Sequence, residues 1–469
     1  MNSTAPTRNP FDLPELILHL SQFVTDEDAI SCALVSQTWT DHFVSVIWYK
    51  VDFNTRPRFA DLSPAIILKH GHHIRVIKNA KTLPHVNALA HPSINKLTNL
   101  HIETATSSLQ NIRAHEIIFR NNHSLGKLDI CAASVPTNKQ DSLAHYVSAP
   151  ALSPCPLHGS SKLTNLKFDN LIMTHDTLVA VLRICPSLSK LQLFSTDIIG
   201  DPTTTSALPY QHTGIKAFGS PLNRVFPTYS NGFSLLSHFP NLTTLCAWNY
   251  DRNFMVPAIR IKKELAQYCP GVTRFHLADS TGALVTEFLT TIANRDVDEF
   301  VFRSRHTSLE LINTVLLHQK TMRTVMPYCP EECLDQDKNE VAPVSNYLQE
   351  SSQLLQLIPR GCPELETLDI YFHEMDIDDV EAEEWACKNL MTLRMRIKGL
   401  DTAEKILKVI ALWRKGCWRR WQKKAGTPVA TSEKEDESDM SIEARVARHL
   451  LKFDKLWTVW LGYQTWTPI

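Results

Sequence analysis

Two short stretches of the sequence begin like the helix of a zinc protease, in which two histidines four residues apart hold the metal. They are HEIIF from His115 and HEMDI from His373. The fifth position is Phe119 in the first and Ile377 in the second, so both lack the second histidine. We therefore expect no metalloprotease site.

Phosphate-binding and nucleophile motifs are also incomplete. Gly214 and Gly219 have the spacing of a phosphate-binding loop, but Ser220 and Pro221 follow where the loop needs Lys and then Ser or Thr. The sequence contains no Gly-x-Ser-x-Gly, the turn that presents a catalytic serine. These absences argue against a nucleotide hydrolase or a serine hydrolase.

Some histidines and cysteines remain as candidate ligands or nucleophiles. CPLH at 155–158 and HGHH at 70–73 could each supply metal ligands, but no second ligand pair stands at zinc spacing. Three cysteines directly precede proline and have no identifiable base, so we interpret them as small buried hydrophobes at turns: Cys185, Cys269 and Cys362. We expect no enzyme activity, no metal and no cofactor.

One segment, LWRKGCWRRWQKK from Leu412 to Lys424, has the composition of a polyanion-binding helix. Its basic residues alternate with tryptophans: Arg414, Lys415, Arg419, Arg420, Lys423 and Lys424 with Trp413, Trp418 and Trp421. The alternative, which we favour, is the solvated face of a repeat helix whose tryptophans pack inward. Nucleic acid is therefore an unfavoured partner.

Composition limits the class of protein. The 469 residues include 48 Lys and Arg and 49 Asp and Glu, and the net charge of −1 provides no overall attraction for nucleic acid or acidic membranes. The N-terminal residues lack an apolar signal region, and the aliphatic run ILKVIALW is too short to span a bilayer. Eleven scattered cysteines are typical of reduced thiols. We expect a soluble protein of the cytosol or nucleus, without a membrane partner.

The elements that carry these residues repeat along the chain. A Leu-x-x-Leu-x-Leu pattern, with other apolar residues allowed, begins at Leu97, Leu125, Leu163, Leu188, Ile215, Leu242, Val272, Val297, Met322, Leu365, Leu390 and Leu456, with a degenerate copy at Ile74. From Leu163 to Met322 the copies start 25–30 residues apart, close to the roughly 20–29-residue period of leucine-rich repeats. A proline often stands two residues before the first position, and helical spacing precedes it.

This pattern predicts an α/β fold in which small helices are followed by a leucine-rich-repeat solenoid, with a concave parallel sheet and convex helices. We place the solenoid at 54–424, with loops near 134–161 and 331–347. An acidic disordered insertion is expected at 425–441, a terminal repeat or cap at 442–469, and a disordered N-terminus at 1–10.

Residues 11–53 differ from the repeats. Leu13, Leu16, Ile17 and Leu20 recur at helical spacing, after which a second helix starts near Thr25 and a third segment covers Asp41 to Trp48. So few helical residues cannot bury this much apolar surface internally. The excess predicts a partner surface or packing on the next domain.

The block resembles the F-box. The resemblance is carried by the Leu13-Pro14-Glu15-Leu16 start, the Ile17 and Leu20 stripe, CALVSQTW, and the closing Trp48. Followed by leucine-rich repeats, it makes the chain similar to F-box proteins of the leucine-rich-repeat class, such as those of filamentous fungi.

The resemblance implies a substrate receptor of a Skp–cullin–F-box ubiquitin ligase. It would contact a Skp-type adaptor and, through it, a cullin and a RING subunit. The residues that the resemblance places at the adaptor, some of which could instead only hold the helices together, are Leu13, Pro14, Leu16, Ile17, Leu20, Ile30, Leu34, Val35 and Trp39.

A protein client, which the sequence does not name, would bind the repeats. Outward positions of the predicted strands would form its surface, with exposed aromatic anchors and arginines for an acidic or phosphorylated segment. They are Lys190, Gln192, Phe194, Trp248, Arg274, His276, Glu299, Arg303, Asp369, Tyr371, Arg394 and Arg396. The alternatives are an F-box scaffold without ubiquitin transfer and a polyanion-binding protein that uses residues 412–424.

Overall fold

The computed structural model describes residues 13–21, 23–104, 108–132, 157, 162–199, 210–226, 234–248, 258–278, 282–302, 308–326, 349–425, 440–462 and 464–466. The chain forms two compact units, unit 1 from Met1 to Ser220 and unit 2 from Pro221 to Ile469. The predicted disordered N-terminus, the two predicted loops and the acidic insertion lie outside the described residues, apart from Leu157, Ala425, Met440 and Ser441.

Unit 1 begins with three helices, α1 (Pro14–Leu20), α2 (Asp26–Ala33) and α3 (Gln37–Tyr49). The Thr25 side chain accepts a hydrogen bond from the Asp28 N–H and so caps α2, as its position before an acidic turn predicts. Ser36 caps α3 in the same way through the Trp39 N–H. This cap explains why the third helix starts at Gln37 and not at Asp41.

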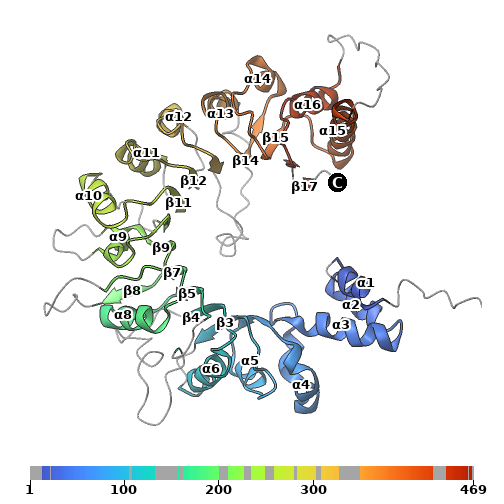
Figure 1. Ribbon diagram of the computed structural model, residues 1–469, viewed down its shortest axis with the longest axis vertical. Helices are drawn as coiled ribbons and strands as arrows, with labels where there is room; N and C mark the ends of the chain where they lie inside the picture. The colour runs from blue at the N-terminus through green and yellow to red at the C-terminus, as the bar shows by residue number, and fades with distance from the viewer. Residues whose placement is uncertain are drawn as a thin grey trace, which may run out of the picture. The chain divides into compact units, whose positions relative to one another are not determined.

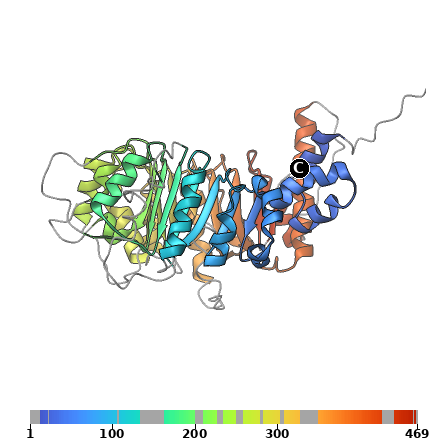
Figure 2. The ribbon, with the colours of Figure 1, turned by 90° about the horizontal axis from the view of Figure 1, so that it is seen from below.

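The repeats of unit 1 supply seven strands, each parallel to the next in chain order (Figures 1 and 2). They are β1 (Lys50–Asp52), β2 (Val76–Ala80), β3 (Asn99–Thr104), β4 (Lys127–Ala132), β5 (Asn165–Asp169), β7 (Lys190–Phe194) and β9 (Ala217–Pro221). The strands β6 (Ile172–Thr174) and β8 (Asp197–Ile199) form a separate parallel pair. Since β1 already pairs with β2, the sheet begins inside the predicted 11–53 block.

The helices of these repeats lie on one side of the strands (Figure 1). They are α4 (Pro64–His70), α5 (Leu83–Leu89), α6 (Ser108–Asn121) and α8 (His175–Ile184), with short 3-10 turns at Pro57–Asp61 and Gly71–His73. We call the opposite side of the sheet the open face, because no described helix of the unit covers it.

Unit 2 continues the same pattern. Its parallel strands are β10 (Thr244–Trp248), β11 (Arg274–Ala278), β12 (Glu299–Phe302), β13 (Thr324–Met326), β14 (Thr367–Met375), β15 (Thr392–Ile397) and β16 (Thr458–Leu461). The last strand, β17 (Gln464–Trp466), pairs antiparallel with β16. The predicted terminal repeat at 442–469 therefore contributes a helix and a strand, and ends in a hairpin.

The helices of unit 2 again lie on one side of its strands (Figure 1). They are α9 (Leu222–Val225), α10 (Ala258–Tyr268), α11 (Gly282–Thr291), α12 (Leu309–Leu316), α13 (Gln349–Gly361), α14 (Ile377–Ala382), α15 (Ala403–Lys424) and α16 (Ile442–Leu450), with a 3-10 turn at Leu235–His238. Helix α15 starts where the sequence predicts, because the Thr402 side chain accepts from the Lys405 N–H.

In both units the register of the strands follows the sequence repeat. The second apolar position of each copy pairs with that of the next copy, and none of these side chains is more than 1% exposed. The row in unit 1 is Val51, Ile77, Leu100, Leu128, Leu166, Leu191 and Phe218. The row in unit 2 is Leu245, Phe275, Phe300, Val325, Leu368, Leu393 and Val459.

These rows form the core between strands and helices. A one-residue slip of any strand would turn its apolar residues to the open face, so burial fixes the register. The expected α/β class with a long parallel sheet is confirmed, and the architecture resembles that of leucine-rich repeats. Ile77, in the copy that looked degenerate, is a full member of its row.

Candidate functional site

Helices α1 and α2 and their connections expose an unusual number of large apolar side chains. Leu34 is 83% exposed and Phe23 is 74% exposed. The large apolar side chains that are exposed among those described in α1, α2 and their connections, which we call the N-terminal apolar surface, are Leu13, Leu16, Leu20, Phe23, Ile30, Leu34 and Val35. Sequence reasoning identified six of the seven but missed Phe23, which follows the first helix and carries no periodic signal of its own.

Two of the expected contact residues lie elsewhere. Ile17 is 0% exposed and packs with Ala29, Ala33 and Phe43 in the centre of the three helices. Trp39 is half-buried against the same cluster and stacks on Phe43, with ring centroids 5.5 Å apart. The expectation that Ile17 lies on the contact surface is therefore wrong, because the small block needs its largest inward aliphatic residue as core. The Pro14 side chain is outside the described residues.

The open face of unit 1 holds three of the predicted client residues, and Gln192 is half-buried between the other two on β7. Lys190 and Phe194 lie on β7 with half-buried side chains, and the Lys167 ammonium of the neighbouring β5 stands 4.3 Å from the Phe194 ring centroid. Lys167 also pairs with Asp169 at 3.5 Å. A cation over the face of an aromatic ring is favourable, so Phe194 is held by its neighbours and still borders solvent.

In unit 2, the open face of β10, β11 and β12 carries a connected polar group. His276 Nε2 lies 2.6 Å from Glu299 Oε1, and His276 Nδ1 lies 3.5 Å from Cys246 Sγ. Arg274 Nε stands 3.6 Å from Asp298 Oδ1 and 3.7 Å from Glu299 Oε2. The residues come together because parallel pairing places Cys246 opposite His276 and Arg274 opposite Glu299.

The electrostatics of this group favour a charged imidazole. Burial alone lowers the pKa of His276, but its hydrogen bonds with Cys246 and Glu299 outweigh burial and raise the pKa to about 10. The hydrogen bond from His276 lowers the pKa of Glu299 from its ordinary value, with help from the charges of His276 and Arg274. At neutral pH the pair is therefore an imidazolium and a carboxylate.

Two strands further along, a second polar group forms on β14, β15 and β16. Arg394 Nη1 lies 3.3 Å from Asp369 Oδ2, and the Arg394 guanidinium stands 4.4 Å from the Trp460 ring centroid. Arg396 is half-buried on the same strand as Arg394. Asp369 is buried, so it serves as the internal partner of Arg394 and is not itself presented to solvent.

Three other predicted client residues do not form part of a described exposed surface. Trp248 is only 3% exposed, which makes its prediction as an exposed anchor wrong: strand alternation gives the direction of the indole but not what packs around it. Arg303 lies outside the described residues, and so does the side chain of Tyr371 on β14. The structure brings Arg274 and His276 together, and separately Asp369 with Arg394, while Arg396 lies two residues further along the same strand as Arg394.

The basic helix α15 also differs from expectation. Trp413 is buried, as the favoured interpretation requires, but Trp418 and Trp421 are each 58% exposed and stack with ring centroids 4.9 Å apart and planes at 22°. The prediction that all three tryptophans pack inward is therefore wrong for this pair. Arg420 bonds to Asp454 and to the Leu451 carbonyl. Four exposed cations have no ion pair with another described residue: Lys415, Arg419, Lys423 and Lys424.

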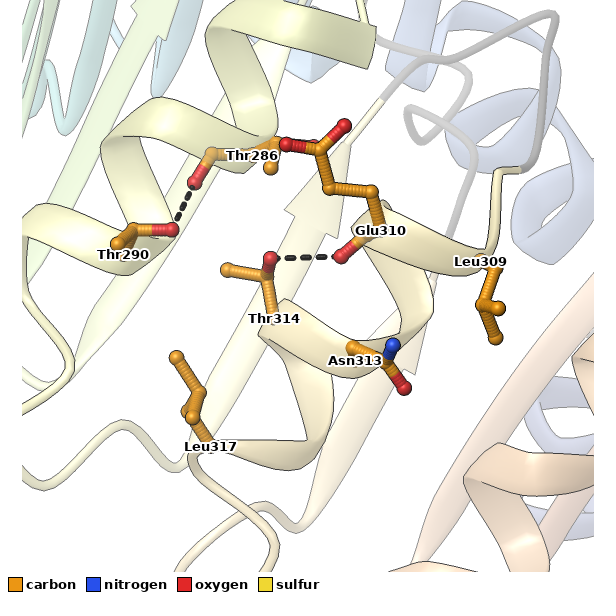
Figure 3. Close-up of a pocket in the computed structure, with 7 residues that line it drawn as sticks. All are labelled: Thr286, Thr290, Leu309, Glu310, Asn313, Thr314 and Leu317. Carbon is orange, nitrogen blue, oxygen red and sulfur yellow. Dashed lines mark hydrogen bonds between the residues drawn. The ribbon is translucent and has the colours of Figure 1, made fainter.

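A cavity of about 510 Å³ lies between α11 and α12 (Figure 3). Thr290 donates to the Thr286 carbonyl and Thr314 to the Glu310 carbonyl, so these hydroxyls are engaged with their own helices. A second cavity, of about 600 Å³, lies in unit 1 beside α4, α5 and α6. Neither cavity gathers the convergent polar groups that mark a small-molecule site.

The other motifs of the sequence have structural roles. Cys185, Cys269 and Cys362 are fully buried, and burial raises the pKa of Cys269 and of Cys362 to about 12, which agrees with their interpretation as packing residues. Within HGHH, His70 stacks on Trp48, and the His72 ring lies against the His73 ring at a tilt of 40°.

Metal clusters and membrane-crossing helices are both absent from the part of the chain that the structure describes. These residues contain no group of three side chains suited to a metal ion. No helix in the described ranges combines the length and apolar character that crossing a bilayer requires.

Comparison with known proteins adds little. No protein family and no curated protein sequence matches the chain. Among solved structures, an internalin (InlF) from Listeria monocytogenes str. 4b F2365 is similar to 67% of this chain and 83% of its own, at 11% identity and a TM-score of 0.27. That score is too low to carry an argument. The architecture therefore rests on the register of the chain itself, and the F-box resemblance rests on the residues that carry it.

Proposed function

We propose that this protein is the substrate-recognition subunit of a Skp–cullin–F-box ubiquitin ligase. In this proposal α1–α3 bind a Skp-type adaptor and, through it, a cullin and a RING subunit. The repeats capture a protein client for ubiquitination. The observation that supports the proposal most is the N-terminal apolar surface, where Leu34 and Phe23 are almost fully exposed.

A gathered set of exposed apolar side chains marks an interaction site in a protein of ordinary composition. Covering such a side chain completely contributes about 1.5–3 kcal/mol. Several of them together can supply a stable docking contact even after the cost of association. A Skp-type adaptor is the partner that the F-box resemblance implies for this surface.

A receptor of this kind does no bond chemistry. It holds the client beside a ubiquitin-charged enzyme and so raises the effective concentration of the client's lysines. The proposal therefore includes no catalytic residue and no cofactor. It also places the protein in the cytosol or nucleus, which the scattered cysteines of the sequence favour.

The test is affinity purification of the full chain beside a Leu34→Ser, Val35→Ser double variant. We expect the parent protein to retain a Skp-type adaptor and a cullin, and the double variant to lose both by about tenfold or more, as removal of about 1.4 kcal/mol or more of contact energy requires. Leu68→Ser is the matched control, because Leu68 is 63% exposed on α4, outside the proposed surface.

Equal adaptor retention by the parent and the double variant would contradict the proposal. An adaptor without a cullin would favour the scaffold that lacks ubiquitin transfer. A client retained by both proteins would identify the partner of the repeats.

The exposed tryptophan pair favours a second candidate function, polyanion binding by α15. Trp418 and Trp421 offer aromatic faces to a nucleotide base, and Lys415, Arg419 and Lys423 follow one another at successive turns of the helix. Aromatic faces beside a row of cations are the means by which proteins bind single-stranded nucleic acid.

Retention on single-stranded DNA over a salt series tests this candidate. If α15 binds it, log affinity falls linearly with log salt, and a Lys415→Gln, Arg419→Gln, Lys423→Gln variant reduces the slope by about two units, at roughly 0.7 for each lost phosphate contact. Lys388→Gln and Lys405→Gln, which remove cations from ion pairs elsewhere in unit 2, should leave the slope unchanged. No retention by the parent protein at low salt would exclude the candidate.

A further inference from the structure

Cys246, His276 and Glu299 form a chain of contacts across three neighbouring strands of unit 2. The thiol comes from β10, the imidazole from β11 and the carboxylate from β12. Cys246 Sγ is 3.5 Å from His276 Nδ1, and His276 Nε2 is 2.6 Å from Glu299 Oε1. A thiol, an imidazole and a carboxylate in this order are the arrangement by which a cysteine becomes a nucleophile.

The hydrogen bond to Glu299 fixes which nitrogen of the His276 ring presents a lone pair to the Cys246 thiol. An ionised Glu299 can only accept hydrogen bonds, so the proton on His276 Nε2 must point to it. In the neutral ring, Nδ1 is then unprotonated and accepts the proton of the Cys246 thiol. The transfer produces a thiolate beside an imidazolium, and Glu299 stabilises the imidazolium at short range.

The surrounding charges agree with this state. The pKa of His276 is raised to about 10, and the pKa of Glu299 is lowered. Among the described residues, Arg274 on β11 also contacts Glu299, and it pairs with Asp298, just before β12, at 3.6 Å. On the neighbouring strands, the open-face residues Thr244 and Thr324 carry no charge.

Unit 1 contains a cysteine–histidine pair whose imidazole contacts a backbone N–H where His276 contacts a carboxylate. Cys131 Sγ lies 3.4 Å from His101 Nε2, again across adjacent parallel strands. Here the Asn79 backbone N–H donates to His101 Nδ1 at 3.4 Å, so the remaining ring proton is on Nε2 and points at the sulfur. His101 therefore cannot accept the thiol proton. Burial raises the pKa of Cys131 to about 12 and lowers the pKa of His101.

We propose that Cys246 is a reactive thiol and the site of a reversible modification by low-molecular-weight disulfides, with His276 as its base and Glu299 as a positioning residue. Its side chain is half-buried on the open face of the sheet and so reaches solvent. Cys131 is the matched unreactive thiol of the same chain. This inference is independent of the proposed ligase function.

The reaction is thiol–disulfide exchange. The Cys246 thiolate attacks one sulfur of the disulfide RSSR, a new bond forms between the two sulfurs, and the original S–S bond breaks. The released RS⁻ leaves with the electron pair and takes a proton from His276 or from water. The disulfide is itself the oxidant, so no other reactant is required.

The experiment follows the modification of each cysteine in the full chain by oxidised glutathione, with peptide mapping by mass spectrometry between pH 6 and pH 8. An ordinary thiol reacts about tenfold faster for each pH unit in this range, because its thiolate fraction rises tenfold. We expect Cys246 to change by less than about threefold over the whole range and, at pH 6, to react at least about tenfold faster than Cys131.

Two variants separate the roles of the partners. Glu299→Gln and His276→Gln should each slow Cys246 at pH 6 and restore the ordinary rise with pH, a change that a purely structural role would not produce. Asp298→Asn is the matched control, because it removes a nearby negative charge that contacts Arg274 and not His276. It should leave the flat profile intact.

A parent protein in which Cys246 shows the ordinary pH rise, or reacts no faster than Cys131, would overturn the proposal. This outcome needs no variant, so it stands even if a substitution prevents folding. A flat profile that persists in His276→Gln would equally remove His276 as the base.

Discussion

His276 Nε2 and Glu299 Oε1 lie 2.6 Å apart on adjacent strands, with only 23% and 25% of the two side chains exposed. An ion pair this enclosed interacts more strongly than one in open solvent. Its protonation state therefore links the stability of unit 2 to pH.

The pH dependence has a definite sign. The pKa of His276 is higher in the folded chain, at about 10, than its ordinary value of 6.5, so folding favours the protonated ring. This contribution is complete below pH 6.5 and is lost as pH rises to about 10. It amounts to a few kcal/mol at most, because stability falls by on the order of 1.4 kcal/mol for each pH unit between the two pKa values. Chemical denaturation of the parent and of His276→Gln at a series of pH values measures it. The variant should lack this decline, and equal slopes would contradict the assignment.

Buried and exposed residues of the N-terminal helices should differ in their contribution to stability. Ile17→Ala removes a completely buried side chain and should lower the free energy of unfolding of the three helices by about 2–4 kcal/mol. Leu34→Ala removes an exposed side chain and should change it by less than about 0.5 kcal/mol. Hydrogen exchange in α1–α3 reports the difference. Similar losses of protection in both variants would mean that Leu34 is part of the core.

The buried rows of the sheet should be sensitive to truncation. Phe275→Ala should destabilise unit 2 by about 3–5 kcal/mol, because it empties the centre of a row in which Phe275 also contacts Phe288 edge to face. Thr244→Ala, on the open face of the neighbouring strand, should cost less than about 1 kcal/mol. Urea denaturation measures both variants, and a small loss for Phe275→Ala would contradict the register.

The tryptophans of α15 should divide into two classes. Trp413→Ala should destabilise unit 2 by about 3–5 kcal/mol, since the indole is buried beneath the helix. Trp418→Ala and Trp421→Ala should each cost about 1 kcal/mol or less, because they lose little beyond their mutual stacking. Thermal denaturation compares the three variants. A large loss of stability for Trp418→Ala would contradict the exposed position of its ring.

The repeat register could be predicted from the sequence because apolar spacing reports burial directly. Leu245, Phe275 and Phe300 are recognisable as successive second positions of one pattern, and a parallel array offers only one pairing that buries all of them. Much of the N-terminal apolar surface was predictable for the opposite reason: a short block holds more apolar residues than it can enclose.

Other features could not be predicted from the sequence, because they depend on what surrounds a side chain in the folded protein. The sequence does not show whether the side chains of Trp248 and Trp418 are buried or exposed. In the structure, packing buries the first and leaves the second exposed. Ile17 belongs to the same helical pattern as Leu16 and Leu20. Its side chain is buried in the centre of the three helices, whereas those of Leu16 and Leu20 are exposed.

By itself, the sequence determined the repeat period, the α/β class and the register of the buried rows, because these follow from the local alternation of apolar and polar residues. Only the tertiary structure placed Cys246, His276 and Glu299 in one chain of contacts. The three residues lie 23 to 53 positions apart, and the lengths of the intervening helices and loops decide which side chains become neighbours across parallel strands. Contacts of this kind depend on distances in space, which apolar periodicity along the chain does not encode.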